Sequence, residues 1–389
     1  MELVTISPSI QYIGVDDKTI DLFESQYIVP HGISYNSYVI LDEKIAVMDT
    51  VDARATGPWL KNLADVLGDR KPDYLVVSHM EPDHASNIQT LAEKYPDMKI
   101  VASAKALSMI PQFFTFDISD RSIVAKEGET LSLGQHTLQF FMAPMVHWPE
   151  VMVSYEQHEK VLFSADGFGK FGALDAEEDW DCEARRYYFN IVGKYGMQVQ
   201  ALLKKAATLD IQTICPLHGP ILKENLGHYI GKYDVWSSYQ PEDEGVFIAY
   251  ASIHGHTAQA AKKLAHILEE KGAKKVVLAD LCRSDLAECV EDAFRYSHLV
   301  LASASYDAGL FPPMEAFLHK LRAKAYQNRV VALVENGSWA PSAGKCMKAI
   351  LEPMKNLRMV EPLVSIRSSL KPETEAQLET LADNLLVAK

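Results

Sequence analysis

The sequence has few cysteines, and none of them are paired in a motif. Its 389 residues contain five cysteines, an odd number, at scattered positions and without a C-x-x-C pair. This pattern argues against a disulfide framework and against a metal module held by thiolates. It favours a protein that works in a reducing compartment.

Positive charge and long apolar runs are also scarce. The chain has 38 Lys and Arg residues and 52 Asp and Glu residues, which gives a formal net charge of −14. Because this charge repels a polyanion, nucleic acid is not an expected partner. No run approaches the roughly 18 apolar residues that a membrane-spanning helix needs. The first residues also lack the basic and apolar regions of a signal peptide. We therefore expect a cytoplasmic protein with no membrane association.

The length and the 48% hydrophobic content allow two or three globular domains. A polar stretch with Pro and Gly at residues 240–245 (QPEDEG) separates two different patterns. We predict one domain over residues 1–243 and a second over residues 246–389.

The first domain reads as short strands with helices between them. This pattern is typical of a mixed sandwich with outer helices. Strands are predicted at residues 34–41, 44–48, 74–77, 99–102, 137–142 and 160–164, and helices at 85–94 and 182–205.

The second domain is more regular, because strands and helices alternate. This alternation predicts a parallel sheet covered on both faces, as in doubly wound folds. Strands are predicted at residues 246–251, 275–279, 298–302 and 329–334, and a helix at 258–271.

A cluster of potential metal ligands follows the strand at residues 74–77. The segment SHMEPDHASN places four of them within six positions, and three more occur where later strands pass into loops. A lone H-x-E would carry little weight, since a single buried histidine is usually a core residue. So many titratable groups at strand ends are costly unless a cation compensates them. The candidates are His79, Glu81, Asp83, His84, His147, Asp166 and His218.

This ligand pattern resembles the metallo-beta-lactamase superfamily at every ligand position. Zinc hydrolases of the superfamily usually carry His where this chain has Glu81, and the anionic oxygen favours non-haem iron over zinc. The resemblance implies that His79, Glu81 and His147 serve one metal, that Asp83 and His218 serve the other, and that Asp166 bridges them. For His84 two roles stay open, that of a metal ligand and that of an outer hydrogen-bonding partner.

A phosphate loop is predicted between the strand at residues 246–251 and the helix that follows. The segment Ser252-Ile253-His254-Gly255-His256-Thr257 resembles the S/T-x-T-G-x-T loop of flavodoxins, with His254 in place of the usual Thr. The unpaired N–H groups and the dipole of a helix N-terminus suit a phosphate without a lysine. By itself the motif is weak evidence, because an ordinary capped turn before a helix has a similar residue pattern.

The loops that follow two later strands support a flavin site. Loops at the carboxyl ends of the strands line the ligand crevice of open parallel sheets. Trp339 is suited to stacking on an isoalloxazine ring, whereas many relatives have a second aromatic residue where this chain has Pro341. Together with residues 252–257, the predicted FMN contacts are Ser303, Ser305, Tyr306, Asp307, Ala308, Gly309, Asn336, Gly337, Ser338, Trp339 and Ala340.

One further motif, G-x-G-x-x-G at residues 167–172, we interpret as a chance match. An acidic segment follows it and no helix opens directly after it, so we reject a dinucleotide site there.

The two domains in this order resemble the flavodiiron proteins, also called A-type flavoproteins. The expected fold is a metallo-beta-lactamase-like αββα sandwich followed by a flavodoxin-like doubly wound parallel sheet. The resemblance implies reduction of dioxygen to water, of nitric oxide to nitrous oxide, or of both. It also implies two iron ions and FMN as cofactors. Trp148 and either Tyr187 or Tyr188 are candidates to shape the gas pocket, although each is equally well a core aromatic.

The resemblance also implies partners. The sequence holds neither a rubredoxin-type pair of C-x-x-C motifs nor an added flavin reductase domain, so we expect electrons from a separate donor such as rubredoxin or a flavin reductase. Relatives form head-to-tail homodimers in which the FMN of one subunit faces the diiron centre of the other. We therefore expect such a dimer, or a dimer of dimers.

Two other functions stay open. With zinc instead of iron, the first domain would be a hydrolase and the flavodoxin-like domain regulatory, although Glu81 speaks against this. A pure electron carrier with a degenerate metal domain is disfavoured because every ligand position is filled. The sequence does not rank dioxygen against nitric oxide.

Overall fold

The computed structural model describes residues 5–388 and divides into two compact units. The N-terminal unit comprises Met1–Tyr187 and Met197–Asp234, and the C-terminal unit comprises Tyr188–Gly196 and Val235–Lys389. A domain limit at residues 243–246 stays a prediction.

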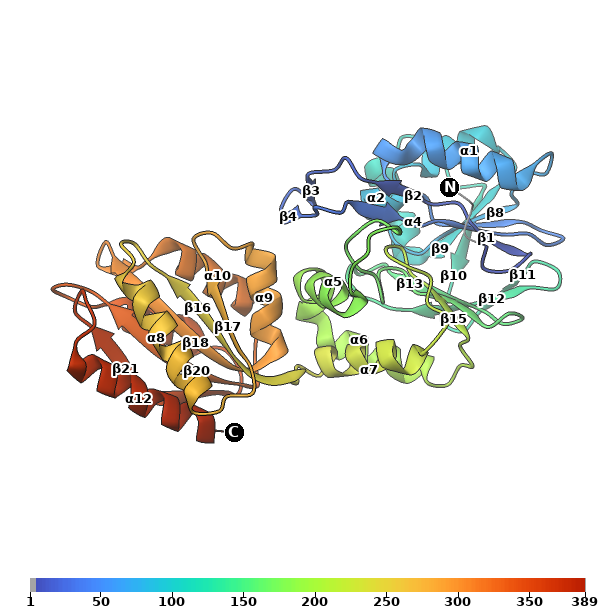
Figure 1. Ribbon diagram of the computed structural model, residues 1–389. Helices are drawn as coiled ribbons and strands as arrows, with labels where there is room; N and C mark the ends of the chain where they lie inside the picture. Colours follow the sequence, from blue (N-terminus) through green and yellow to red (C-terminus); the bar gives the residue numbers. More distant parts are fainter. Residues whose placement is uncertain (1–4, 389) are drawn as a thin grey trace. The chain divides into compact units, whose positions relative to one another are not determined.

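Two sheets form the N-terminal unit (Figure 1). The six strands of the first sheet, in spatial order, are β1 (Ile10–Tyr12), β6 (Tyr38–Ile40), β7 (Ala46–Met48), β8 (Tyr74–Val77), β9 (Lys99–Ser103) and β10 (Ser122–Ala125). Those of the second sheet are β11 (Thr130–Ser132), β12 (Thr137–Met142), β13 (Met152–Glu156), β14 (Val161–Phe163) and β15 (Thr213–Cys215). Two small pairs join β2 (Val15–Asp17) to β5 (Ile33–Tyr35) and β3 (Leu22–Phe23) to β4 (Tyr27–Ile28).

The core of this unit lies between the two sheets. Alternate residues of facing strands, such as Tyr74 and Val76 on β8 and Leu138 and Phe140 on β12, meet in one buried cluster. This is the period of two that a strand imposes on its side chains. The two sheets therefore pack face to face.

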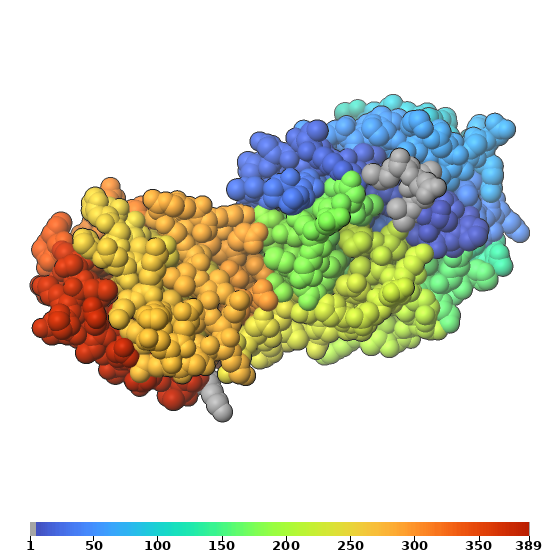
Figure 2. Space-filling view, viewed as in Figure 1, coloured from blue at the N-terminus to red at the C-terminus, as the bar shows by residue number. Residues whose placement is uncertain are grey.

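Helices cover the outer faces of both sheets (Figure 1). On α1 (Thr56–Leu67), Trp59, Leu63 and Leu67 recur every fourth residue and are buried, as on an amphipathic helix. The segment with α6 (Gly196–Ala206) and α7 (Leu226–Ser237), coloured yellow-green, lies at the surface of the unit (Figure 2). The remaining helices are α2 (Pro82–Ala85), α3 (Ile88–Lys94), α4 (Ala104–Phe113) and α5 (Trp180–Tyr187). The predicted αββα sandwich is confirmed.

The C-terminal unit is a parallel sheet with the spatial order β17, β16, β18, β20, β21. In chain order this is 2-1-3-4-5, the flavodoxin-like order. The short β19 (Gly309–Leu310) pairs antiparallel with β18. The bounds are β16 (Asp243–Ala251), β17 (Val276–Asp280), β18 (Tyr296–Tyr306), β20 (Arg329–Asn336) and β21 (Leu357–Ile366).

Helices lie on both faces of this sheet, which explains why all eight residues of β20 are buried. Residues of α8 and α12 share one core cluster with alternate residues of the strands, and both helices lie on one face in Figure 1. The bounds are α8 (His256–Glu270), α9 (Leu286–Arg295), α10 (Pro312–Ala323), α11 (Ala343–Leu351) and α12 (Pro372–Val387). The predicted doubly wound sheet is confirmed.

Two predicted elements of the N-terminal half are interrupted. The strand expected over residues 34–41 divides into β5 and β6, because the Asn36 side chain turns away to donate to the carbonyls of Pro216 and Gly219, both at 2.8 Å. The helix expected over 182–205 divides into α5, a π-helical turn at Tyr188–Val192, a 3-10 turn at Gly193–Tyr195 and α6.

Two strands of the C-terminal unit are longer than predicted. β18 continues past Ala302 to Tyr306, and a turn at Asp307 and Ala308, both with positive φ, leads into β19. β20 continues to Asn336. Small and polar residues at the strand ends gave these segments the composition of loops.

Among residues 5–388, no helix combines the length and the apolar character needed to cross a bilayer.

Candidate metal centre and cofactor loops

The first four candidate ligands are placed by the end of β8 and by the short helix α2. His79 and Glu81 follow the strand, and Asp83 and His84 lie on α2, which starts at Pro82. Buried Asp49 accepts the backbone N–H of Ser78 at 2.6 Å and so fixes the end of the strand. The Thr50 hydroxyl, which donates to the carbonyl of His84 at 2.6 Å, fixes the helix.

Four of the seven side chains converge in a first cluster. Glu81 Oε2 lies 3.2 Å from His79 Nε2 and 3.0 Å from His147 Nε2. Asp166 Oδ2 lies 3.4 Å from the same nitrogen of His79 and 3.1 Å from that of His147. All four ligand atoms fall within 4.8 Å of one another, a spacing suited to one metal ion.

The other three side chains form a second cluster. Asp83 Oδ2 lies 3.2 Å from both His84 Nε2 and His218 Nε2, and the two imidazole nitrogens are 3.1 Å apart. His84 therefore points its Nε2 atom into this cluster, together with the two ligands that were predicted for the second metal. The geometry favours the ligand role for His84 over the outer role.

Asp166 lies between the clusters and faces both of them. Its Oδ2 atom faces the first cluster, as described, and its Oδ1 atom lies 3.3 Å from His84 Nε2 and 3.9 Å from His218 Nε2. The side chain is 1% exposed. Each oxygen serves one cluster, which is the arrangement that a bridging carboxylate requires.

Two outer contacts orient the histidines, and sequence reasoning missed both. His79 Nδ1–H donates to Glu150 Oε1 at 2.8 Å, and His218 Nδ1–H donates to the backbone carbonyl of Ser34 at 2.7 Å. Such contacts fix the tautomer of a ligating imidazole and leave Nε2 free for a metal. Glu150, three residues after His147, gave the one usable signal, a carboxylate in a loop that already carries a ligand.

The charges of this region fit a cation. Burial lowers the pKa of His147, but Asp166 and Glu81 outweigh it and raise this pKa to about 9. Burial raises the pKa of Asp166, yet His79, His147 and His84 hold it well below its usual value. Both oxygens of Asp83 and of Asp166 are buried without a hydrogen-bond donor. Buried carboxylates are expensive without compensation, and metal ions would provide it.

Aromatic side chains surround the metal centre. The Trp148 ring lies 5.2 Å from the His79 ring, and the Tyr187 ring lies 5.6 Å from the His218 ring, between centroids. Tyr188 instead packs against Trp236 at 5.5 Å and belongs to the C-terminal unit. Of the two tyrosines considered, Tyr187 is the one beside the metal centre.

The predicted phosphate loop has the geometry of an open helix N-terminus. Gly255, with φ of 91°, precedes α8, and no side chain caps the helix. Ser252 Oγ accepts the N–H of Gly255 at 3.1 Å and closes the loop. Ile253, His254 and His256 are exposed, and Thr257 is buried. The free N–H groups of the first turn suit an anion.

The two further loops lie beside it, because β18 is next to β16, and β20 is next to β18. Ser305 Oγ accepts the N–H groups of Ser342 at 2.8 Å and of Ala343 at 3.1 Å, so it ties the two loops together. A Cβ on Gly337 would lie 2.8 Å from Pro341 Cα, which explains the glycine there.

Several predicted FMN contacts have other partners in this structure. Ser303 is buried and donates to the carbonyl of Ala304, and Asn336 exchanges hydrogen bonds with the backbone of Ser368. Ser338 bonds the Ser368 hydroxyl. Trp339 is 87% exposed and Tyr306 46%, so both rings are available to a ligand. Asp307, Ala308 and Gly309 form the turn into β19, and Ala340 follows Trp339 in an exposed segment.

The rejected G-x-G-x-x-G segment, residues 167–172, forms turns that support Asp166 and does not open a helix. The N–H of Gly169 donates to the carbonyl of Asp166 at 3.1 Å. Gly169 therefore supports a candidate ligand, and the segment does not have the helix N-terminus of a dinucleotide site.

Comparison with known proteins agrees with both halves of this description. Residues 33–219 match the family described as "ODP family beta lactamase". The chain is 28% identical over 401 residues to the rubredoxin-oxygen oxidoreductase of Megalodesulfovibrio gigas, with 99% of this chain and 98% of that protein covered. It is 28% identical over 372 residues to a nitric oxide reductase of Moorella thermoacetica, with 92% of each chain covered.

Solved structures give the same result. The rubredoxin oxygen:oxidoreductase of Desulfovibrio gigas superposes with a TM-score of 0.92 over 100% of both chains, at 28% identity. The flavodiiron protein of Giardia intestinalis has a TM-score of 0.88 at 24% identity, covering 99% of this chain and 96% of that one, and supports the fold. Cyanobacterial diflavin flavoproteins are longer, and the chain spans 55% of the length of one from Synechocystis.

Proposed function

The chain belongs to the flavodiiron protein family, and we propose that it reduces dioxygen to water, nitric oxide to nitrous oxide, or both. The observation that carries this proposal is the pair of ligand clusters joined by Asp166, with a carboxylate at Glu81. Anionic oxygen ligands with imidazoles suit iron better than zinc.

The cofactors proposed are two iron ions and FMN. His79, Glu81 and His147 would hold one iron and Asp83, His84 and His218 the other, with Asp166 shared. When bound, the iron ions supply open positions for a diatomic gas, and the flavin supplies electrons.

The protein's own residues prepare the metal centre. The bonds to Glu150 and to the Ser34 carbonyl hold His79 and His218 with Nε2 toward the clusters. The Trp148 and Tyr187 rings pack against the rings of His79 and His218 and so hold them in place. Such fixed surroundings spare the reaction the cost of reorganising its environment.

The flavin site is proposed at the carboxyl edge of the C-terminal sheet. The N-terminus of α8 would bind the phosphate, and Trp339 would stack on the isoalloxazine ring. FMN fits better than FAD because only one phosphate cradle is apparent in the described loops. Protein that releases FAD on denaturation would contradict this site.

The experiment that tests the function combines metal analysis with turnover. Protein produced with ample iron should contain about two metals per chain, mostly iron, as this ligand set implies. Anaerobic steady-state assays of the reduced protein with each gas would then rank dioxygen against nitric oxide. Full zinc occupancy together with phosphatase or lactamase turnover would contradict the proposal and favour the hydrolase.

We also propose the cellular setting and the assembly. The unpaired cysteine pattern supports the reducing cytoplasm, and a separate rubredoxin or flavin reductase would supply electrons. A head-to-tail homodimer, or a dimer of dimers, would bring the FMN of one subunit to the diiron centre of its partner.

Complementation tests this assembly. One variant, His79→Ala, removes iron, and a second disrupts residues 252–257 to remove FMN. Coexpressed, they should form mixed dimers that regain activity from one intact pair of sites. Proven mixed dimers with native-like folding and no activity would count against the arrangement.

A further inference from the structure

An apolar cavity with two adjoining chambers lies in the N-terminal unit, between the second sheet and the helices α6 and α7. The inner chamber has a volume of about 20 Å³ and the outer chamber about 150 Å³. The two share five lining residues and therefore lie side by side. These are Leu162, Phe168, Leu203, Ala206 and Leu209, which lie at the boundary of the two chambers.

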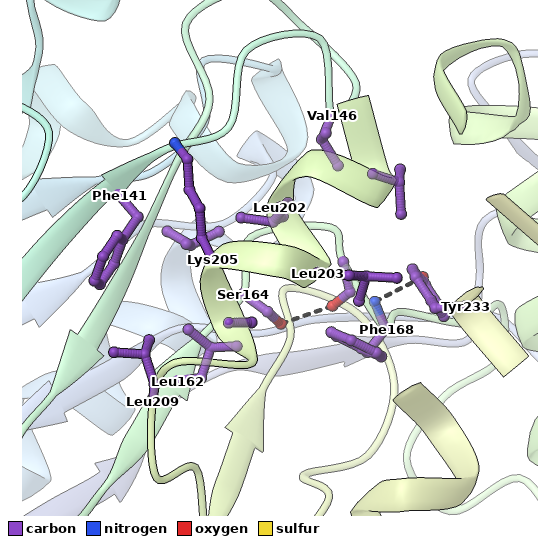
Figure 3. A pocket seen from close by; sticks show the side chains of 14 residues that line it. Phe141, Val146, Leu162, Ser164, Phe168, Leu202, Leu203, Lys205, Leu209 and Tyr233 are labelled. Atoms are coloured by element: carbon purple, nitrogen blue, oxygen red, sulfur yellow. Dashed lines mark hydrogen bonds between the residues drawn. The ribbon is translucent and has the colours of Figure 1, made fainter. Parts of the chain in front are cut away.

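Almost the whole lining of the inner chamber is apolar, and its few polar side chains are already engaged (Figure 3). The Ser164 hydroxyl donates to the carbonyl of Gly167 at 2.6 Å, and the Tyr233 hydroxyl accepts the N–H of Phe168 at 2.6 Å. Lys205 Nζ lies 2.9 Å from both Glu127 Oε1 and the carbonyl of Met142. A water in the inner chamber would find no free side-chain partner, and apolar cavities in other proteins stay dry and take up xenon.

The inner chamber lies against the backbone next to two candidate ligands. Val146, which lines it, directly precedes the ligand His147, and Gly167, which also lines it, directly follows Asp166. Consecutive Cα atoms are about 3.8 Å apart. The backbone that carries one ligand of the first cluster and the shared carboxylate is thus the inner wall of the chamber.

The outer chamber ends at the protein surface. It is lined by Ala207, which is exposed, and by Leu209 and Ile211, which are partly exposed. These residues follow the end of α6, and the segment that contains them lies at the surface in Figure 2. A small molecule that entered here would meet mainly apolar side chains before the wall beside the ligands.

We propose that the two chambers form a passage that carries an uncharged diatomic gas from solvent to the metal centre. The proposal rests on the proposed function, and it adds a route and an occupant. An apolar lining favours a small neutral molecule and disfavours ions, which would lose their hydration without compensation. About 10 to 15 Å³ holds one water-sized molecule, so the inner chamber has room for a single small guest.

Xenon shows directly whether the chambers take up an apolar atom, whatever the protein reduces. Crystals of the protein under xenon pressure should show xenon in the outer chamber and, at higher pressure, in the inner chamber. Xenon in neither chamber would overturn the proposal.

The passage itself is tested by filling it. Ala206 lines both chambers, whereas Ala201 lies on the same helix and is exposed. Ala206→Phe should slow the association of nitric oxide with the reduced iron protein by about threefold or more, because a restricted entry lowers the association rate. Ala201→Phe is the matched control and should leave the rate unchanged.

Stopped-flow absorbance measures this rate without turnover, so the result is informative even if the chain reduces neither gas. Iron content and thermal unfolding of both variants establish that they are folded and loaded. If Ala206→Phe does not fold, Leu209→Phe replaces it in the same measurement. An unchanged rate in a variant whose crystal structure shows filled chambers would overturn the proposal.

Discussion

The two units build their sites from different parts of the chain. In the N-terminal unit, side chains make the site: those of His79, His84 and Asp166 are almost fully buried. In the C-terminal unit, backbone N–H groups and exposed rings would make the proposed flavin site, with Trp339 at the surface. The difference teaches that the first site depends on residue type at each position and the second on the path of the chain.

The largest effect is expected from the shared carboxylate. Asp166→Ala should abolish activity and remove both metals, since each oxygen faces one cluster. The loss should exceed the roughly 10- to 100-fold drop in affinity that follows removal of an outer partner. Metal analysis of the purified variant measures it, and Asp83→Ala, which should affect the second cluster alone, is the control. Loss of only one metal in Asp166→Ala would contradict the bridge.

Glu150→Gln should weaken metal binding by about 10- to 100-fold, because His79 loses its anionic partner while the amide keeps the size of the side chain. Competition with a chelator measures the affinity. The matched control is Glu335→Gln, a buried glutamate of the other unit that accepts from Gly344 N at 2.7 Å. If both variants bind metal equally well, Glu150 is not the orienting group.

Metal binding should depend on pH. Without metal, His147 has a pKa raised to about 9, because Asp166 and Glu81 outweigh the effect of burial, so its imidazole is protonated at pH 7. Ligation needs the neutral ring, and metal binding therefore releases a proton. The affinity should rise by about tenfold per pH unit for each proton released and level off above about pH 9. Calorimetry in buffers of different ionisation enthalpy counts the protons, and a count of zero at pH 7 would exclude this coupling.

The smallest effect is expected at the exposed edge of the second site. Trp339→Ala should weaken FMN binding by about 2- to 10-fold, the contribution of one aromatic contact. Fluorescence titration of the flavin-free protein measures this change, and iron content should stay the same. A parallel loss of iron would show that the two sites are not independent.

The candidate ligands of the first site could be proposed residue by residue, because side chains of particular types make up such a site. The seven candidate ligands converge in two clusters. The outer contacts could not be predicted: the Ser34 carbonyl carries no sequence signal, and its bond to His218 depends on a fold that joins residues 184 positions apart. The role of Glu150 in orienting His79 is apparent only from the structure, where its Oε1 atom lies 2.8 Å from His79 Nδ1.

For the proposed flavin site, the sequence predicted which segments lie together but not the contacts of each residue. Strand alternation predicted three neighbouring loops, and the sheet order brings them together. The strand ends were placed too early, so Ser303 and Asn336 were expected in loops although they lie on strands. Backbone hydrogen bonds decide these details, and any residue type can make them.

The contact between Ser34 and His218 also determines when the metal centre can exist during synthesis. His218 emerges 218 − 79 = 139 residues after His79. At about 5 to 20 residues per second, the early ligands wait on the order of 10 s for it. Until then β5 lacks its partner loop, and the second cluster lacks one of its imidazoles. We therefore expect iron to enter only after release of residue 219 from the ribosomal tunnel, so that loading is a final step of maturation for this unit.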